Sequence, residues 1–199
     1  MKKSLFVIIP LSIILFWVFR MSGNESLYID DVKKTRAERV EYLENDTGSP
    51  FKKFQKKFVR PNYFPISSDF RVTAKVQKIK NRETIVITNS EGNPTKFEKY
   101  AILDFKLKGE DHQLLVLRPR LLGTEKELFC GFTDITTGRS TYEGGRYIDV
   151  QLGKANRVVL DFNLAYNPYC AYVPGYSCPI PPAQNHINVA IESGERTLK

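Results

Sequence analysis

The chain has 199 residues and a formal net charge of +8. This length suits one domain of about 150 to 175 residues with a hydrophobic core, preceded by a short N-terminal segment. The positive charge is mild, and the sequence has no zinc finger, other nucleic-acid module or basic run interleaved with aromatic residues, so we expect no nucleic-acid partner.

The first apolar segment follows a basic start. Lys2 and Lys3 precede the uncharged residues 4–19, a pattern typical of a signal peptide or an uncleaved signal anchor. Residues 19–23 lack the pair of small residues that marks a cleavage site, which favours an anchor helix. We therefore expect a membrane partner through residues 4–20 and a domain outside the cytoplasm, in the periplasm or at the cell surface. Secretion after cleavage is the alternative.

A helical pattern follows the first segment and continues to about residue 45. Ser22 and Glu25 fit a capping box. Residues that share one face of the predicted helix are Ile29, Val32, Arg36, Val40 and Leu43. After the stop signal at 45–50, Phe51, Phe54 and Phe58 share one face of a second, short helix. Its lysine-rich face could lie on a membrane surface, or the phenylalanines could simply cap the core.

From about residue 70 the apolar residues alternate with a period of two, which is typical of strands. The candidate strands are 70–80, 83–88, 100–108, 112–118, 127–133, 146–152, 156–162 and 187–192. Because short links cannot join parallel neighbours, the sheet is expected to be antiparallel and to curl into a barrel or a two-sheet sandwich.

The predicted fold class is therefore mainly β (α+β). It comprises an antiparallel β barrel or sandwich of about eight strands with an N-terminal helix pair, preceded by a membrane-anchor helix. The expected division is residues 1–22 as signal anchor or signal peptide and 24–199 as a single domain, helical over 24–60 and mainly β over 63–199.

The densest stretch is Leu160–Pro182, with five prolines, four tyrosines and two cysteines. Prolines remove backbone donors and push the preceding residue toward extended geometry, so this stretch cannot be a helix. Its many aromatic and apolar side chains argue against disorder. We interpret it as an ordered loop packed on a sheet.

These residues carry a resemblance to a known family. The motif comprises Asp161-Phe162-Asn163-x-Ala165-Tyr166-Asn167-Pro168-x-Cys170-Ala171-Tyr172, Tyr176-x-Cys178-Pro179, Pro181-Pro182-x-x-Asn185, Gly145-Arg146-Tyr147 and Ala190-Ile191-Glu192-x-Gly194-Glu195. The chain resembles the bacterial and archaeal DUF1684 family over roughly residues 28–196. The resemblance implies a family domain and no established activity.

The cysteines permit three interpretations. Cys170 and Cys178 could form a disulfide if the domain is exported, or remain free thiols, as we expect for Cys130 in an apolar strand. A zinc site would need His186 and a fourth ligand, for which Cys130 or Asp161 could be proposed. The spacing lacks the tight Cys-x2-Cys clamp, so we expect no metal.

A second group of polar residues suggests a site. The candidate residues are Tyr142, Arg146, Tyr147, Asp161, Asn163, Tyr166 and Asn167, with Asp134 and Glu143 nearby in sequence. If 146–152 and 156–162 formed a hairpin, Arg146 and Asp161 would lie at the same open end and could pair. Such a pair could bind an anion, or it could be a structural link that holds the loop.

The familiar catalytic motifs for serine hydrolases, P-loop enzymes, dinucleotide-binding enzymes and zinc proteases are not found, and we expect no cofactor. The function we expect is a membrane-tethered DUF1684-like binding or interaction module of the cell envelope. The alternative is an enzyme, such as a hydrolase, that uses Arg146, Asp161, Asn163 and Tyr166.

Overall fold

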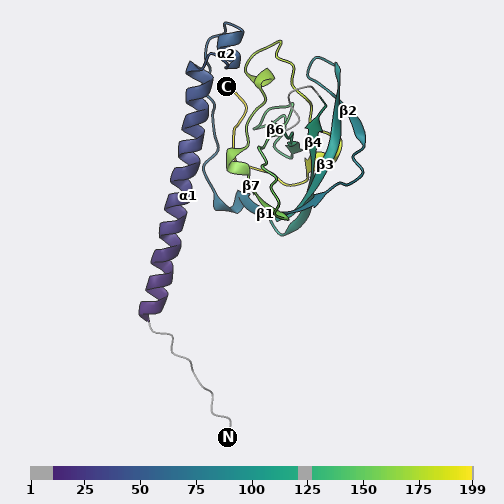
Figure 1. The fold of residues 1–199 in the computed structure, drawn as a ribbon. Helices are drawn as coiled ribbons and strands as arrows, with labels where there is room; N and C mark the ends of the chain where they lie inside the picture. Colours follow the sequence, from purple (N-terminus) through teal and green to yellow (C-terminus); the bar gives the residue numbers. More distant parts are fainter. Residues whose placement is uncertain (1–10, 121–126, 199) are drawn as a thin grey trace.

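A computed structural model describes the backbone of residues 11–120 and 127–198, with side chains from residue 24 onward. One helix, α1 (Leu11–Asn45), extends well beyond the body that it flanks (Figure 1). Its predicted inner face is confirmed, because Val32, Val40 and Leu43 are buried. A turn at Asp46 ends the helix at the predicted stop.

The second helix, α2 (Pro50–Lys53), is a single turn. Its N-cap is Ser49, whose hydroxyl accepts a hydrogen bond from the Lys52 amide, and Pro50 occupies the first turn, where a missing amide proton costs nothing. Phe51 is buried against Tyr172, whereas Phe54 is 40% exposed. The predicted second helix is therefore much shorter than its sequence pattern suggests.

The described residues form eight strands after α2. They are β1 (Arg71–Lys78), β2 (Thr84–Thr88), β3 (Pro94–Leu107), β4 (Glu110–Pro119), β5 (Gly131–Asp134), β6 (Arg146–Tyr147), β7 (Arg157–Asp161) and β8 (His186–Ile187). Four short 3-10 helices lie among them: η1 (Ser68–Phe70), η2 (Phe162–Leu164), η3 (Tyr169–Ala171) and η4 (Ala183–Asn185).

The larger sheet is organised around β3. One edge of this long strand pairs first with β2 and then with β1, while its other edge pairs with β4. The strand β7 extends the sheet beyond β1, with Arg71 opposite Asp161. The β3–β4 turn contains Lys108 and Gly109, both at positive φ, as a two-residue hairpin turn requires.

The smaller sheet has the order β6-β5-β8. Its β5–β8 pair is parallel, with Thr133 opposite His186. Next to it, the side-chain amide of Asn185 bonds both backbone groups of Leu115 in β4 and the carbonyl of Gly131. This buried amide therefore links the two sheets through the predicted ordered loop.

The strand β4 is buried on both faces. Leu114 and Val116 face the main core, whereas Leu115 and Leu117 face a second cluster with Phe97. Two-sided burial explains why the run of apolar residues in this strand does not alternate with polar ones.

Several predictions about the fold are wrong. The described strands do not close into a barrel, the β5–β8 pair is not antiparallel, and one helix with a short turn replaces the helix pair. The segments 146–152 and 156–162 do not form a hairpin, because β6 pairs with β5 and β7 pairs with β1. These partners lie far away in sequence, and periodicity alone does not identify them.

The membrane-anchor helix is also not supported. Residues 1–10 of the predicted segment lie outside the described residues, and 11–20 form the beginning of α1. Across the described part of the chain, no helix combines enough length and apolar character to cross a membrane.

Candidate functional site

Two arginines on α1 face the body of the protein. Arg36 and Arg39 are three positions apart, so they lie on the same side of the helix as the buried valines. The Arg36 guanidinium donates to the carbonyl of Asn163 at 2.9 and 3.1 Å and to the carbonyl of Phe64 at 3.0 Å. Arg36 also stacks over the Tyr63 ring, with Cζ 4.5 Å from the centroid.

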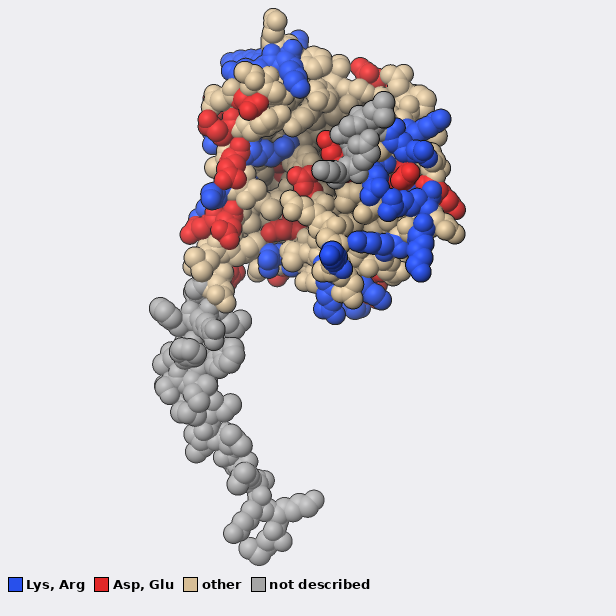
Figure 2. All heavy atoms as spheres, viewed as in Figure 1, with Lys and Arg blue, Asp and Glu red and all other residues tan. Residues whose placement is uncertain are grey.

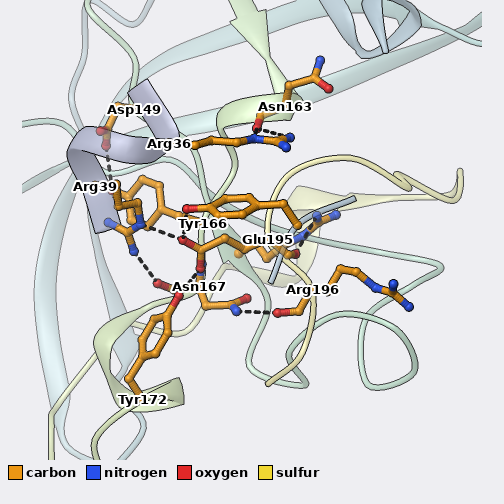
Figure 3. A network of polar contacts seen from close by, with 11 residues as sticks. Arg36, Arg39, Asp149, Asn163, Tyr166, Asn167, Tyr172, Glu195 and Arg196 are labelled. Atoms are coloured by element: carbon orange, nitrogen blue, oxygen red, sulfur yellow. Dashed lines mark hydrogen bonds and ion pairs between the residues drawn. The ribbon is translucent and has the colours of Figure 1, made fainter. Parts of the chain in front are cut away.

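Arg39 binds a carboxylate from the other end of the chain. Its Nε lies 2.7 Å from Oε1 of Glu195, a residue with no exposed surface. The Tyr63 and Tyr172 hydroxyls and the Asn167 amide also donate to this carboxylate. Figure 3 shows Arg39 from α1 and Asn167 and Tyr172 from the ordered loop converging on Glu195 of the C-terminal segment. Glu195 is therefore the acceptor that joins three separate parts of the fold.

A second network surrounds Asn163. The side chain of this fully buried residue accepts from the Ser67 amide and the Ser193 hydroxyl, and it donates to the Ser67 carbonyl. Its amide nitrogen also donates to the Tyr28 hydroxyl at 2.7 Å and to Asp161 at 2.9 Å. These bonds fix Asp161 at the C-terminal end of β7.

A cavity of about 540 Å³ lies between these two networks, where α1 crosses the edge of the larger sheet. Its charged lining residues are Arg36, Glu38, Arg39, Arg71, Asp149 and Asp161; its aromatic lining residues are Tyr42, Tyr63 and Tyr166; Thr35, Ile148, Val159 and Leu164 complete the walls. We call this space the α1 cavity.

The two acids that belong to the sheet side of the α1 cavity already have partners. Asp149 accepts the Tyr166 hydroxyl at 2.7 Å. Asp161 accepts the Tyr28 hydroxyl at 3.1 Å and lies 4.0 Å from Arg71. By contrast, no described carboxylate lies within 4.0 Å of the Arg36 guanidinium, whose recorded acceptors are backbone carbonyls.

Burial and neighbouring charges shift the pKa values of these groups. It lowers the pKa of Arg36, because a buried cation loses hydration. Burial also lowers the pKa of Arg39, but the Glu195 carboxylate more than offsets this effect, so that the pKa is raised. Burial and then the Glu195 charge raise the pKa of Tyr63. Tyr63 therefore stays a neutral hydrogen-bond donor at physiological pH.

The predicted site residues do not form one cluster. Asp161 and Tyr166 line the α1 cavity, and Asn163 and Asn167 lie behind it in the networks. Tyr147 donates to the Pro179 carbonyl. The structure therefore brings together Asp161, Asn163, Tyr166 and Asn167, which lie at the end of β7 and after it.

The expected pairing of Arg146 with Asp161 is wrong. Arg146 is 1% exposed and pairs with Asp134 at 2.7 Å, while Nη1 donates to the carbonyls of Ser193 and Glu195 and Nη2 also donates to that of Ile191. The Asp161 carboxylate lies near Arg71 instead. Arg146 comes from β6 and Asp161 from β7, and these strands belong to different sheets, which separates the two side chains.

The cysteines lie apart from the α1 cavity. All three are free thiols in the structure, with Cys130 buried in the main core. The Tyr142 hydroxyl donates to Sγ of Cys170 at 3.7 Å, and the Cys170 amide donates to Sγ of Cys178 at 3.2 Å. Within the described ranges, no three His, Cys, Asp or Glu side chains are placed to hold a metal ion. The disulfide stays a prediction.

The cationic half of the cavity was not predicted. Arg36 was expected on the inner face of the helix but had no predicted role, and Arg39 and Arg71 were not among the candidate residues. One signal was available: a charged residue among apolar positions at helical spacing is expected to meet a polar partner in the body. Glu195 also occurred in the family motif but was not assigned a role.

The fold and cavity define a mainly β domain with one flanking helix, joined to it through buried polar networks. The chain belongs to the family described as "Protein of unknown function (DUF1684)", whose model matches residues 56–196. It is similar to the solution NMR structure of an uncharacterised protein of Haloarcula marismortui, with 31% identity and a TM-score of 0.66. That match covers 88% of this chain and 97% of the archaeal one. No curated protein matches the sequence.

Proposed function

We propose that this DUF1684 domain is a binding module and that its α1 cavity takes a small molecule with an anionic group. The observation that carries the proposal is the cavity of about 540 Å³ with three arginines in its lining. Sites for small molecules are commonly clefts of roughly 300–1,000 Å³ with a few convergent polar groups.

The lining holds three arginines and three acids, and the acids are the more engaged of the two. Asp149 and Asp161 accept hydrogen bonds from tyrosine hydroxyls, and Glu38 lies 4.0 Å from Lys34. Arg36 has only carbonyl acceptors, and Arg71 is half-exposed with one distant carboxylate. Arginine presents a planar fork of donors that suits carboxylates and phosphates. Arg36 and Arg71 can therefore donate further hydrogen bonds to an anionic ligand in the α1 cavity.

The aromatic residues indicate what else the ligand carries. Tyr42, Tyr63 and Tyr166 contribute ring surface to the α1 cavity, and such rings bind apolar or planar groups. Two of the rings are held in place by arginines that stack on them, Arg36 on Tyr63 and Arg39 on Tyr166. A molecule with an anionic group and a compact organic body would match both features.

The alternative function, an enzyme that uses Arg146, Asp161, Asn163 and Tyr166, lacks a shared site. Arg146 is fully buried with Asp134, away from the α1 cavity, and Asn163 is fully buried in the network behind it. Neither residue has surface to offer a substrate. The location of the domain outside the cytoplasm stays a prediction, which protease treatment of intact cells would test.

Thermal-shift measurements with carboxylates, phosphates, neutral sugars and amines test the proposal. A ligand at about 100 times its Kd stabilises the folded state by about 2.7 kcal/mol, which for a domain of this size raises Tm by roughly 5–10 °C. We expect this shift from an anion, and we expect Arg71→Gln to abolish it.

Arg82→Gln is the matched control. Arg71 has an ion pair at 4.0 Å, ring stacking on Tyr28 at 5.3 Å and 50% side-chain exposure. Arg82 has an ion pair at 3.9 Å, stacking on Tyr100 at 4.8 Å and 40% exposure, but it lies outside the α1 cavity. Stabilisation by neutral sugars or amines alone, or equal loss of binding in both variants, would contradict the proposal.

A further inference from the structure

Two of the three cysteines lie next to each other in the folded chain. The Cys170 amide donates to Sγ of Cys178 at 3.2 Å, although seven residues separate them in sequence. Both side chains are free thiols. Cys170 is partly exposed and Cys178 is 5% exposed. The more accessible thiol therefore has a protected thiol as its neighbour.

The backbone holds each cysteine independently. Cys178 is bound to the β2–β3 turn in both directions: the Ser90 amide donates to its carbonyl at 2.8 Å, and its own amide donates to the Ser90 hydroxyl at 3.1 Å. Cys170 belongs to η3, whose Ala171 amide bonds the Pro168 carbonyl at 3.0 Å. The proximity of the two sulfur atoms therefore results from two separately fixed segments.

Hydrogen bonds make the two thiols unequal. The Cys178 thiol, with help from the Tyr142 and Ser90 hydroxyls, holds the pKa of Cys170 at about 6. The hydrogen bond to Cys170 and burial raise the pKa of Cys178. Of the two thiols, Cys170 is therefore the one that ionises at the lower pH. Thiolates are the reactive form of cysteine in oxidation and exchange.

We propose that Cys170 and Cys178 form a redox-active pair, in which Cys170 is oxidised by a hydroperoxide and Cys178 resolves the product as a reversible disulfide. This pair is a modification site separate from the α1 cavity.

Both steps balance. The Cys170 thiolate attacks one peroxide oxygen, so that an S–O bond forms and the O–O bond breaks. The leaving alkoxide or hydroxide takes a proton from water, and sulfur becomes a sulfenic acid while the peroxide is reduced to an alcohol or water. The Cys178 sulfur then attacks the Cys170 sulfur. The S–S bond forms, the S–O bond breaks, and the hydroxide leaves as water with the Cys178 proton.

Cys130 provides an internal control. It is 2% exposed in the main core, and burial raises its pKa to about 12. It is therefore neither accessible nor ionised at neutral pH, and the same oxidant is not expected to modify it. The comparison needs no substitution, because chymotryptic cleavage after Tyr172 and Tyr176 places each cysteine on its own peptide.

The test treats the fully reduced, full-length protein with about one equivalent of hydrogen peroxide at neutral pH, followed by alkylation and peptide mapping. We expect a mass loss of two hydrogen atoms, a Cys170–Cys178 cross-link, and full recovery after dithiothreitol. Cys170 is expected to react at least about tenfold faster than Cys130, because its thiolate fraction is larger. Oxidation of Cys130 first, or no cross-link while Cys170 is oxidised, would overturn the proposal.

Trapping variants test the order of the steps. Cys178→Ser removes the resolving thiol, so dimedone is expected to label Cys170 in this variant and hardly at all in the wild type. Cys178→Ala serves as a second variant, and circular dichroism checks the fold of both. Dimedone labelling that stays absent in both folded variants would contradict the assigned roles.

Discussion

Nε of Arg39 lies 2.7 Å from Oε1 of Glu195, across 156 positions of sequence. This contact joins α1 to the C-terminal segment, and Tyr172 brings the ordered loop to the same carboxylate. Figure 3 shows Arg39 and Tyr172 directed toward Glu195. Because α1 forms one wall of the α1 cavity, the pair that holds the helix in place also maintains the shape of the proposed binding site.

Loss of the Glu195 charge is expected to destabilise the protein strongly. Glu195→Gln leaves Arg39 largely buried without its counter-charge, which costs about 3–5 kcal/mol for a buried pair. Urea denaturation measures the free energy of unfolding. The control is Asp111→Asn, which removes an exposed pair with Lys106 at 2.9 Å and is expected to cost less than about 1 kcal/mol. Equal effects of the two substitutions would refute a structural role for Glu195.

The Asn163 amide is predicted to be structural. In Asn163→Ala, the part-buried Ser67 amide and the buried Ser193 hydroxyl lose their acceptor, and an unsatisfied buried group costs about 1–3 kcal/mol. Unfolding curves are expected to show this loss, with little change for the exposed Asn81→Ala. An unchanged free energy of unfolding, with altered ligand binding, would instead identify Asn163 as a ligand-contacting residue.

The protein is expected to lose stability at alkaline pH because tyrosines are buried. Burial, followed by the Glu195 charge, raises the pKa of Tyr172 well above 10.0 in the folded state. Unfolded tyrosine releases its proton near pH 10, so above this pH the unfolded state binds fewer protons than the native state. Stability then falls by up to about 1.4 kcal/mol per pH unit for each such tyrosine.

The substitution Tyr172→Phe tests this pH dependence. The variant is expected to be less stable than the wild type at neutral pH, because Glu195 loses a donor. Its stability should then fall less steeply between about pH 10 and 11, since one titrating group is absent. Parallel curves for variant and wild type over this range would contradict the assignment.

Arg146 is predicted to affect stability without affecting ligand binding. Arg146→Met leaves the buried Asp134 without its counter-charge, at a cost of about 3–5 kcal/mol. The double variant Arg146→Met/Asp134→Asn removes both charges and is expected to recover part of this loss. Binding of the anion by the folded fraction should be unchanged, as isothermal titration below the unfolding temperature would show. A specific loss of binding would place Arg146 in the site after all.

Much of the larger sheet could be predicted from the sequence. Alternating side chains identify β1, β2 and β7 to within a few residues, and Lys108-Gly109 identifies the β3–β4 turn. The ordered loop was also recognisable, because proline excludes a helix and the aromatic side chains need a surface to pack on. In these segments the local pattern is a direct consequence of which face is buried.

The smaller sheet and half of the site could not be predicted. The strands β6 and β8 have two residues each, which is too short for any period to emerge. The partner of Arg146 is set by the β5–β6 pairing, which places it near Asp134 instead of Asp161. Likewise, the ion pair between Arg39 and Glu195 depends on how α1 packs across the sheet. The spacing of residues within the helix does not predict which residue Arg39 will contact.

The face shown in Figure 2 carries a basic region that could compete for anions. Lys and Arg gather over β2 and β3, whereas acidic and basic side chains are mixed along α1 (Figure 2). Arg82 and Arg120 belong to this basic region, and both lie near Glu98. Exposed charges of this kind bind ions weakly and lose them in salt. The α1 cavity differs because two of its arginines, Arg36 and Arg39, are held in place by part-buried hydrogen bonds.

The most direct test of the account is an NMR titration of the ¹⁵N-labelled domain with the anion that gives the largest thermal shift, at physiological ionic strength. We expect saturable chemical-shift changes at Arg36, Arg39 and Arg71, and along Val159–Asp161, with Arg71→Gln abolishing them and Arg82→Gln leaving them intact. Changes confined to Arg82 and Arg120, or changes that do not saturate, would contradict the proposal that the α1 cavity is the binding site.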